Sequence, residues 1–166
     1  MKSISLADFF LEELRAEVPA TRKCLERISP DTFKYKPHEK SMEMGYLTIL
    51  VADIPRWITH ILEKSEVNFA TFERWEFTST EVLLKKFDEH VKGAEASIQK
   101  IQDEDFDGIF ELKNKDQVLQ SQSKKEAVSS TLNHWVHHRG QLTVYMRLND
   151  ILVPSIYGPS ADEKTF

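Results

Sequence analysis

The sequence predicts an all-α fold, namely a four-helix bundle with a long crossover between its third and fourth helices. Apolar residues recur at three- and four-residue steps in four separate stretches. Serine or threonine capping residues precede these stretches, and no segment shows a convincing strand alternation. Because 166 residues suit one domain, we expect a single bundle over residues 1–166.

Composition restricts the possible partners and compartment. Hydrophobic residues make up 40% of the chain and charged residues 30%, so a soluble chain with a sizeable core is expected. The net charge of −5 argues against nucleic acid as a partner, since phosphate binding needs a basic face. No signal-peptide core and no membrane-length apolar run is seen. The single Cys24 excludes an internal disulfide and fits a reducing compartment, so we expect a cytoplasmic protein.

The first helix is predicted over residues 5–28, with Ser5 as its cap. The residues that keep the helical period are Leu6, Phe10, Leu14, Val18, Thr21, Leu25 and Ile28. Pro19 interrupts this pattern, because its ring clashes with the carbonyl of Arg15. The sequence therefore predicts a kink or a break at Pro19.

The second helix is predicted over residues 42–64, capped by Ser41. Its inner face comprises Leu47, Leu50, Ile54, Trp57, Ile58 and Ile61. Pro55 removes one N–H and frees the carbonyl of Val51, which predicts a bend close to Leu50. Such a bend either adjusts packing or opens space in the bundle centre.

The following connection and third helix carry two further expectations. Residues 65–78 contain Phe69, Phe72, Trp75 and Phe77, four aromatics that either cover an end of the core or form an interface. A capping box at residues 78–81 starts the third helix, which runs to about residue 101. His90 falls off its apolar stripe, so an exposed side chain is predicted.

The third and fourth helices are joined by a long crossover. Residues 103–108 begin like a calcium loop, but Asn114 stands where a bidentate glutamate is needed, so we interpret them as a solvated acidic turn. A short strand or hairpin near Phe110 is one option for the rest. Ser123 and Glu126 form the capping box of the fourth helix, which ends near Asn149. The remaining tail is predicted to fold back as coil over the bundle end.

The fourth helix carries the candidate site. His134 and His138 stand four residues apart, so both rings lie on one helix face and can bind one divalent metal ion. His137 points about 100° away around the helix. The alternative is that the pair are histidines at the core edge, hydrogen-bonded to other side chains.

Four blocks of this chain carry a family resemblance. They are YKPHEKSM at residues 35–42, GYLTILVADIPRW at 45–57, NHWVHHRGQ at 133–141 and VPSIYGPSADE at 153–163. With these blocks the chain resembles the DinB/YfiT-like family of four-helix bundle proteins. The resemblance implies a three-histidine zinc or nickel site, a homodimer and, in some relatives, transfer of small-molecule thiols or isomerisation of thiol adducts.

The chain departs from this family at one predicted metal ligand. The family pattern places the third histidine where this chain has Leu50, while His134 and His138 match. Two neutral imidazoles bind a divalent ion far more weakly than three. Asp53, one turn further, is a possible substitute ligand, whereas His60 lies about 15 Å along the helix.

Three functional hypotheses follow. In the first, the protein is a metal-dependent transferase or hydrolase for small molecules or thiols, and the bound metal lowers the pKa of a water or thiol. The second is a metal-free pseudoenzyme that binds a small molecule, and the third is a structural homodimer. The retained pair of His134 and His138 favours the enzyme, and Leu50 favours the pseudoenzyme.

Overall fold

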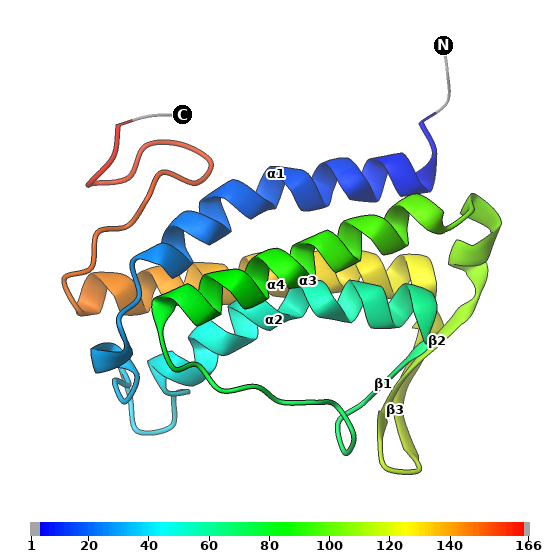
Figure 1. The fold of residues 1–166 in the computed structure, drawn as a ribbon, viewed down its shortest axis with the longest axis horizontal. Helices are drawn as coiled ribbons and strands as arrows, with labels where there is room; N and C mark the ends of the chain where they lie inside the picture. The colour runs from blue at the N-terminus through cyan, green and yellow to red at the C-terminus, as the bar shows by residue number, and fades with distance from the viewer. Residues whose placement is uncertain (1–3, 165–166) are drawn as a thin grey trace.

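Four long helices pack lengthwise in the computed structural model, which describes residues 4–164 (Figure 1). They are α1 (Leu6–Glu26), α2 (Met44–Glu63), α3 (Thr80–Lys100) and α4 (Lys124–Leu148). This arrangement confirms the predicted helical bundle. None of the helices in the described part of the chain is long and apolar enough to cross a bilayer.

Three of the four helices begin at serine caps. The hydroxyl of Ser5 accepts a hydrogen bond from the backbone N–H of Asp8 at 3.0 Å, and Ser79 caps α3 in the same way. At the start of α4, Ser123 and Glu126 form the predicted capping box. Each cap satisfies a backbone donor that has no partner inside the helix, which fixes where the helix starts.

The start of α2 differs from the prediction. The helix begins at Met44 rather than at residue 42, and its N-cap position is Glu43, which makes no side-chain capping bond. Carbonyl groups of the preceding loop satisfy the first helix donors instead, including the 3.0 Å bond from Gly45 N to Phe33 O. A Cβ atom on Gly45 would lie 2.9 Å from Phe33, so this close approach needs glycine. The predicted cap at Ser41 is therefore wrong.

Both internal prolines lie within continuous helices. Helix α1 runs through Pro19 without a break, so the predicted break at this proline is wrong. Leu14, Thr21 and Leu25, on either side of the proline, are fully buried. Their packing offsets the single hydrogen bond that the proline removes.

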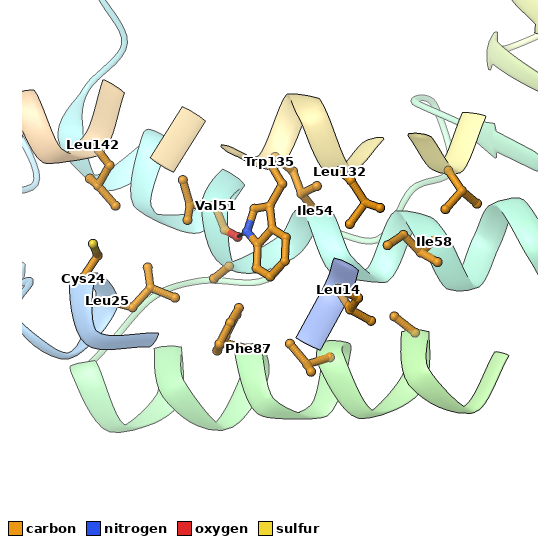
Figure 2. Close-up of a cluster of buried hydrophobic side chains, with 14 of the residues drawn as sticks. Leu14, Cys24, Leu25, Val51, Ile54, Ile58, Phe87, Leu132, Trp135 and Leu142 are labelled. Carbon is orange, nitrogen blue, oxygen red and sulfur yellow. Dashed lines mark hydrogen bonds between the residues drawn. The ribbon is translucent and has the colours of Figure 1, made fainter. Parts of the chain in front are cut away.

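Trp135 of α4 lies in the middle of the core, where it is 1% exposed (Figure 2). Its Nε1–H donates a 2.8 Å hydrogen bond to the carbonyl of Val51, the group freed by Pro55. Phe87 of α3 packs against the indole with ring centroids 6.0 Å apart. The proline in α2 thus supplies the acceptor that a buried tryptophan N–H requires.

A small three-stranded sheet lies at one end of the bundle (Figure 1). Its strands are β1 (Glu66–Asn68), β2 (Ile109–Asn114) and β3 (Gln117–Ser123), with β1 parallel and β3 antiparallel to the central β2. The hairpin option near Phe110 is confirmed, but the expectation of no sheet is wrong. Residues 117–123 read QVLQSQS and lie mostly exposed, so they lack the alternation that identifies a half-buried strand.

A buried ion pair joins α1, α4 and the C-terminal tail. Arg139 is 2% exposed, and its Nη1 lies 2.6 Å from the carboxylate of Glu17. The same guanidinium donates to Thr21 Oγ1 at 3.0 Å and to the hydroxyl of Tyr157 at 2.7 Å. The Tyr157 hydroxyl donates in turn to Glu17. The predicted coil of the tail is thereby held against the two helices.

Replacing Glu17 by glutamine keeps the side-chain volume but leaves the Arg139 charge buried without its carboxylate. We expect the free energy of unfolding to fall by about 3 kcal/mol, measured by urea denaturation. Glu95→Gln is the matched control, because Glu95 pairs with the half-exposed Arg15. That variant should lose less than about 1 kcal/mol. Equal losses in the two variants would contradict a structural role for the buried pair.

Candidate functional site

Three hydrogen bonds set how α4 lies against α2. Each joins a side chain at or near α4 to a backbone carbonyl at or near α2. They are Tyr145 Oη to Met42 O at 3.1 Å, Trp135 Nε1 to Val51 O at 2.8 Å and Lys124 Nζ to Leu62 O at 2.9 Å. Residue numbers rise along one helix as they fall along the other, so the two helices are antiparallel with a constant register.

This register brings Leu50 to the candidate site. Residue 51 is level with residue 135, so Leu50 is level with residue 136, midway between His134 and His138. Leu50 is half-buried and packs against the core. The side chain on α2 at the level of the histidine pair is therefore aliphatic and has no lone pair to offer a metal.

The structure brings His134 and His138 together on one face of α4, as their spacing predicts. Their Nε2 atoms lie 2.7 Å apart, and His138 Nδ1 lies 2.7 Å from Gln141 Oε1. The amide oxygen accepts, so His138 carries its proton on Nδ1. Nε2 of His138 is then the acceptor for an Nε2–H of His134. In this arrangement one nitrogen of the pair already donates to the other.

Both histidines are neutral at pH 7. Burial lowers the pKa of His134 to about 4, with further lowering by the nearby His138 and His137. Burial also lowers the pKa of His138, against the opposing effect of its hydrogen bond to Gln141. Neutral imidazole is the form that binds metal ions and also the form that makes an N–H···N hydrogen bond.

Asp53, the possible substitute ligand, already has two hydrogen-bond donors. Its Oδ1 accepts from Trp75 Nε1 at 3.0 Å, and its Oδ2 accepts from Arg56 Nη2 at 2.9 Å. His90 lies 3.6 Å from the same carboxylate and 3.1 Å from the carbonyl of Ala52. The prediction that His90 is exposed is therefore wrong, because α3 packs closely enough on α2 to enclose it.

A three-ligand metal site is not assembled in this structure. Across residues 4–164, no three His, Cys, Asp or Glu side chains converge as a metal would require. His134 and His138 offer two nitrogens, and Leu50 and the engaged Asp53 add no further ligand from α2. These residues do not fit the three-histidine site that the resemblance implies.

An aromatic pocket of about 210 Å³ lies beside the histidine pair. Its wall includes Leu50, Trp57, Phe69, Phe72 and Trp75, from α2 and the segment that follows β1. The ring centroids of Trp57 and His134 are 5.9 Å apart, so one wall residue of the pocket packs against His134, which does not itself line the pocket. We refer to this hollow as the aromatic pocket.

The aromatic residues of the 65–78 connection have two roles. Phe77 covers the core, as one predicted alternative states, and its ring centroid lies 4.2 Å from that of Phe33. Phe69, Phe72 and Trp75 instead line the aromatic pocket. In the sequence, the clustering of these aromatic residues in one connection is the signal for the pocket. Only the fold shows that they enclose it.

Comparison with known proteins places the chain in a family. The model of the DinB family matches residues 4–165. The uncharacterized protein YrdA of Bacillus subtilis (strain 168) is 24% identical over 160 residues, covering 94% of this chain and 90% of YrdA. None of these descriptions names a ligand or a reaction.

Two crystal structures of DinB-like proteins share the fold. The Bacillus subtilis protein YjoA superposes with a TM-score of 0.70 at 20% identity, covering 89% of this chain and 97% of YjoA. A protein from Bacillus cereus ATCC 10987 gives a TM-score of 0.68 at 21% identity, covering 89% and 95%. At such identities the likeness concerns the fold alone, whereas the family model spans nearly every residue. This chain belongs to the DinB family.

Proposed function

We propose that this chain is a metal-independent binding protein that holds a small apolar or aromatic molecule in the aromatic pocket. The observation that carries the proposal is the position of Leu50. This side chain lies level with the His134–His138 pair and also forms part of the pocket wall. An aliphatic group at that point favours an apolar ligand over a metal ion.

The chemistry of the pocket supports the same proposal. Large aromatic side chains offer extensive apolar contact and ring stacking to a planar ligand. Asp53 is the one acidic group on the pocket's α2 wall, and Trp75 and Arg56 bind its two oxygens. A ligand therefore meets a largely apolar surface with the neutral imidazole of His134 nearby.

A second candidate is a divalent metal site, zinc or nickel, at His134 and His138 in a transferase or hydrolase that acts on small molecules or thiols. The convergence of the two Nε2 atoms at 2.7 Å favours it. Binding would require His134 to move its proton from Nε2 to Nδ1. With two protein ligands the affinity for the metal ion would be low.

We also propose a cytoplasmic homodimer. Val144 and Leu148 are more than half exposed on the outer face of α4, one turn apart, and Leu152 follows them. Such a row of apolar side chains suits contact with a second copy.

Cys24 is buried, and burial raises the pKa of its thiol to about 11, so an unreactive thiol in a reducing compartment is expected.

The proposed pocket predicts binding of 1-naphthol to protein purified without an affinity tag, in the presence of a chelator. Trp57→Ala removes a large part of the wall, and we expect it to weaken binding roughly tenfold. Phe9→Ala is the control, because Phe9 is an exposed aromatic on α1 outside the pocket. Fluorescence titration measures the affinity. Failure of 1-naphthol to bind, or equal loss in both variants, would reject the pocket as a ligand site.

The register of α2 and α4 predicts that Leu50→His creates a zinc site. We expect zinc affinity to rise about a hundredfold, measured by calorimetry on tag-free protein. Ile49→His is the matched control, since it places a histidine on the same pocket wall about 100° around the helix. Equal gains in the two variants would show that the register is not responsible. Stoichiometric zinc or nickel in the purified wild-type protein would favour the second candidate instead.

The low pKa of His134 predicts a loss of stability at acid pH. Above pH 6.5 the ring is neutral in both the folded and unfolded states. Between pH 6.5 and about 4 the unfolded state takes up a proton that the folded state does not, so the free energy of unfolding falls with pH. Between pH 7 and pH 5, wild type should lose about 1 kcal/mol more than His134→Gln, with allowance for partial ring exposure. Urea denaturation measures the free energy of unfolding at each pH. Equal losses in wild type and His134→Gln between pH 7 and pH 5 would contradict this prediction.

A further inference from the structure

A second hollow of about 280 Å³ lies next to the aromatic pocket. Arg56 and His60 line it from one face of α2, with Lys64 following at the C-cap, because residues four apart lie one above the other on a helix. Thr71 closes it from the segment after β1. We call this space the basic hollow.

Phe72 separates the two spaces and borders both. On one side, its ring centroid lies 6.0 Å from that of Trp57 in the aromatic pocket. Towards the basic hollow, the guanidinium carbon of Arg56 lies 4.1 Å from the ring centroid, and the His60 ring lies 5.0 Å away. Phe72 and Glu73 line both hollows, and two polar side chains pack on the Phe72 ring.

The donors of the basic hollow are largely uncommitted. Arg56 uses Nη2 for Asp53 and for the carbonyl of Glu73, but its Nε is buried and has no acceptor within residues 4–164. The side chains of His60 and Lys64 form no hydrogen bond or ion pair with another residue in the described range. The Arg56 Nε is enclosed by protein, so the donors that remain open to a ligand in this hollow include those of His60 and Lys64.

The acidic groups at the rim leave room for an anion. Glu66 lines the hollow but is paired with Lys113 at 3.1 Å. Glu73 also borders it and is exposed, so its carboxylate can turn into water, where its charge is screened. Lys64 and Arg56 then line the space together with Thr71 and His60, and Lys64 is the cation without a carboxylate partner among the described residues, since Asp53 pairs with Arg56.

We infer that the basic hollow is a binding site for an oxyanion such as a phosphate group, held by Arg56, His60 and Lys64. Nitrogen donors with positive charge make short, strong hydrogen bonds to phosphate oxygens. Burial, with Lys64 and Arg56 nearby, lowers the pKa of His60, so at pH 7 its ring is a neutral N–H donor and the positive charge comes from the other two side chains. This inference does not depend on the proposed function of the aromatic pocket.

Inorganic phosphate is the first probe, titrated at pH 7 and constant ionic strength while the ring resonances of His60 are followed by NMR. We expect a saturable shift, with the affinity reduced roughly tenfold in Lys64→Gln. Lys92→Gln, an exposed charge removed from α3, is the control and should change the affinity less than about twofold. Glu73→Gln should strengthen binding a few-fold, since it removes the opposing charge at the rim.

Two results would overturn the inference. One is the absence of a saturable shift at His60. The other is an equal loss of affinity in Lys64→Gln and Lys92→Gln, which would reduce the effect to general attraction by surface charge.

A second probe, 1-naphthyl phosphate, distinguishes free phosphate from a phosphate carried by a larger ligand. If one ligand spans both hollows, it should bind about tenfold more tightly than inorganic phosphate, and Trp57→Ala should abolish that advantage. Equal affinity for the two probes assigns the site to free phosphate. Binding of phosphate without binding of 1-naphthol would reject the aromatic pocket and leave the oxyanion site standing.

Discussion

The hydrogen bond from Trp135 to the carbonyl of Val51 is the contact on which the arrangement of this bundle depends. Pro55 cannot donate to that carbonyl, so a buried acceptor is available in the middle of α2. Trp135 brings the one donor of its indole to this point in the core. Sliding α4 by one residue would leave both groups buried without partners, at a cost of roughly 1–3 kcal/mol for each. The register of the two helices is therefore strongly constrained, and it sets which α2 side chain faces the histidine pair.

The same constraint accounts for the surroundings of the histidine pair. With Leu50 at the level of the pair, His134 and His138 satisfy each other through an N–H···N bond. Asp53 takes a structural role, because it holds Trp75 and Arg56 and so positions the segment that walls both hollows. One partly buried carboxylate thereby organises an apolar space and a polar one that both border Phe72.

Local patterns in the sequence were sufficient for the four helices, the caps at Ser5 and Ser123 and the histidine pair. Each of these depends on residues within one or two helical turns of each other. The predicted cap at Ser41 and the capping box at residues 78–81 are wrong, because Glu43 and Ser79 occupy those N-cap positions. The other missed features depend on contacts between distant segments. His90 is enclosed only because α3 packs on Ala52 and Asp53, and β3 forms a strand despite its polar composition because β2 pairs with it. The basic hollow was also hidden, because Arg56, His60 and Lys64 resemble an ordinary solvated helix face until Phe72 and Thr71 close over them.

The orientation of α4 about its own axis has a separate cause from its register. Trp135 points into the core, whereas Arg139, one turn later, reaches Glu17 and Thr21 on α1. Rotating the helix to turn His138 away from α2 would pull the buried guanidinium out of its carboxylate, and an unpaired buried charge costs about 3–5 kcal/mol. The Arg139–Glu17 pair therefore restrains the imidazoles without touching the aromatic pocket. A residue about 100° around α4 from His138 thus helps to position the pair, and this accounts for a buried arginine where an apolar side chain would pack more simply.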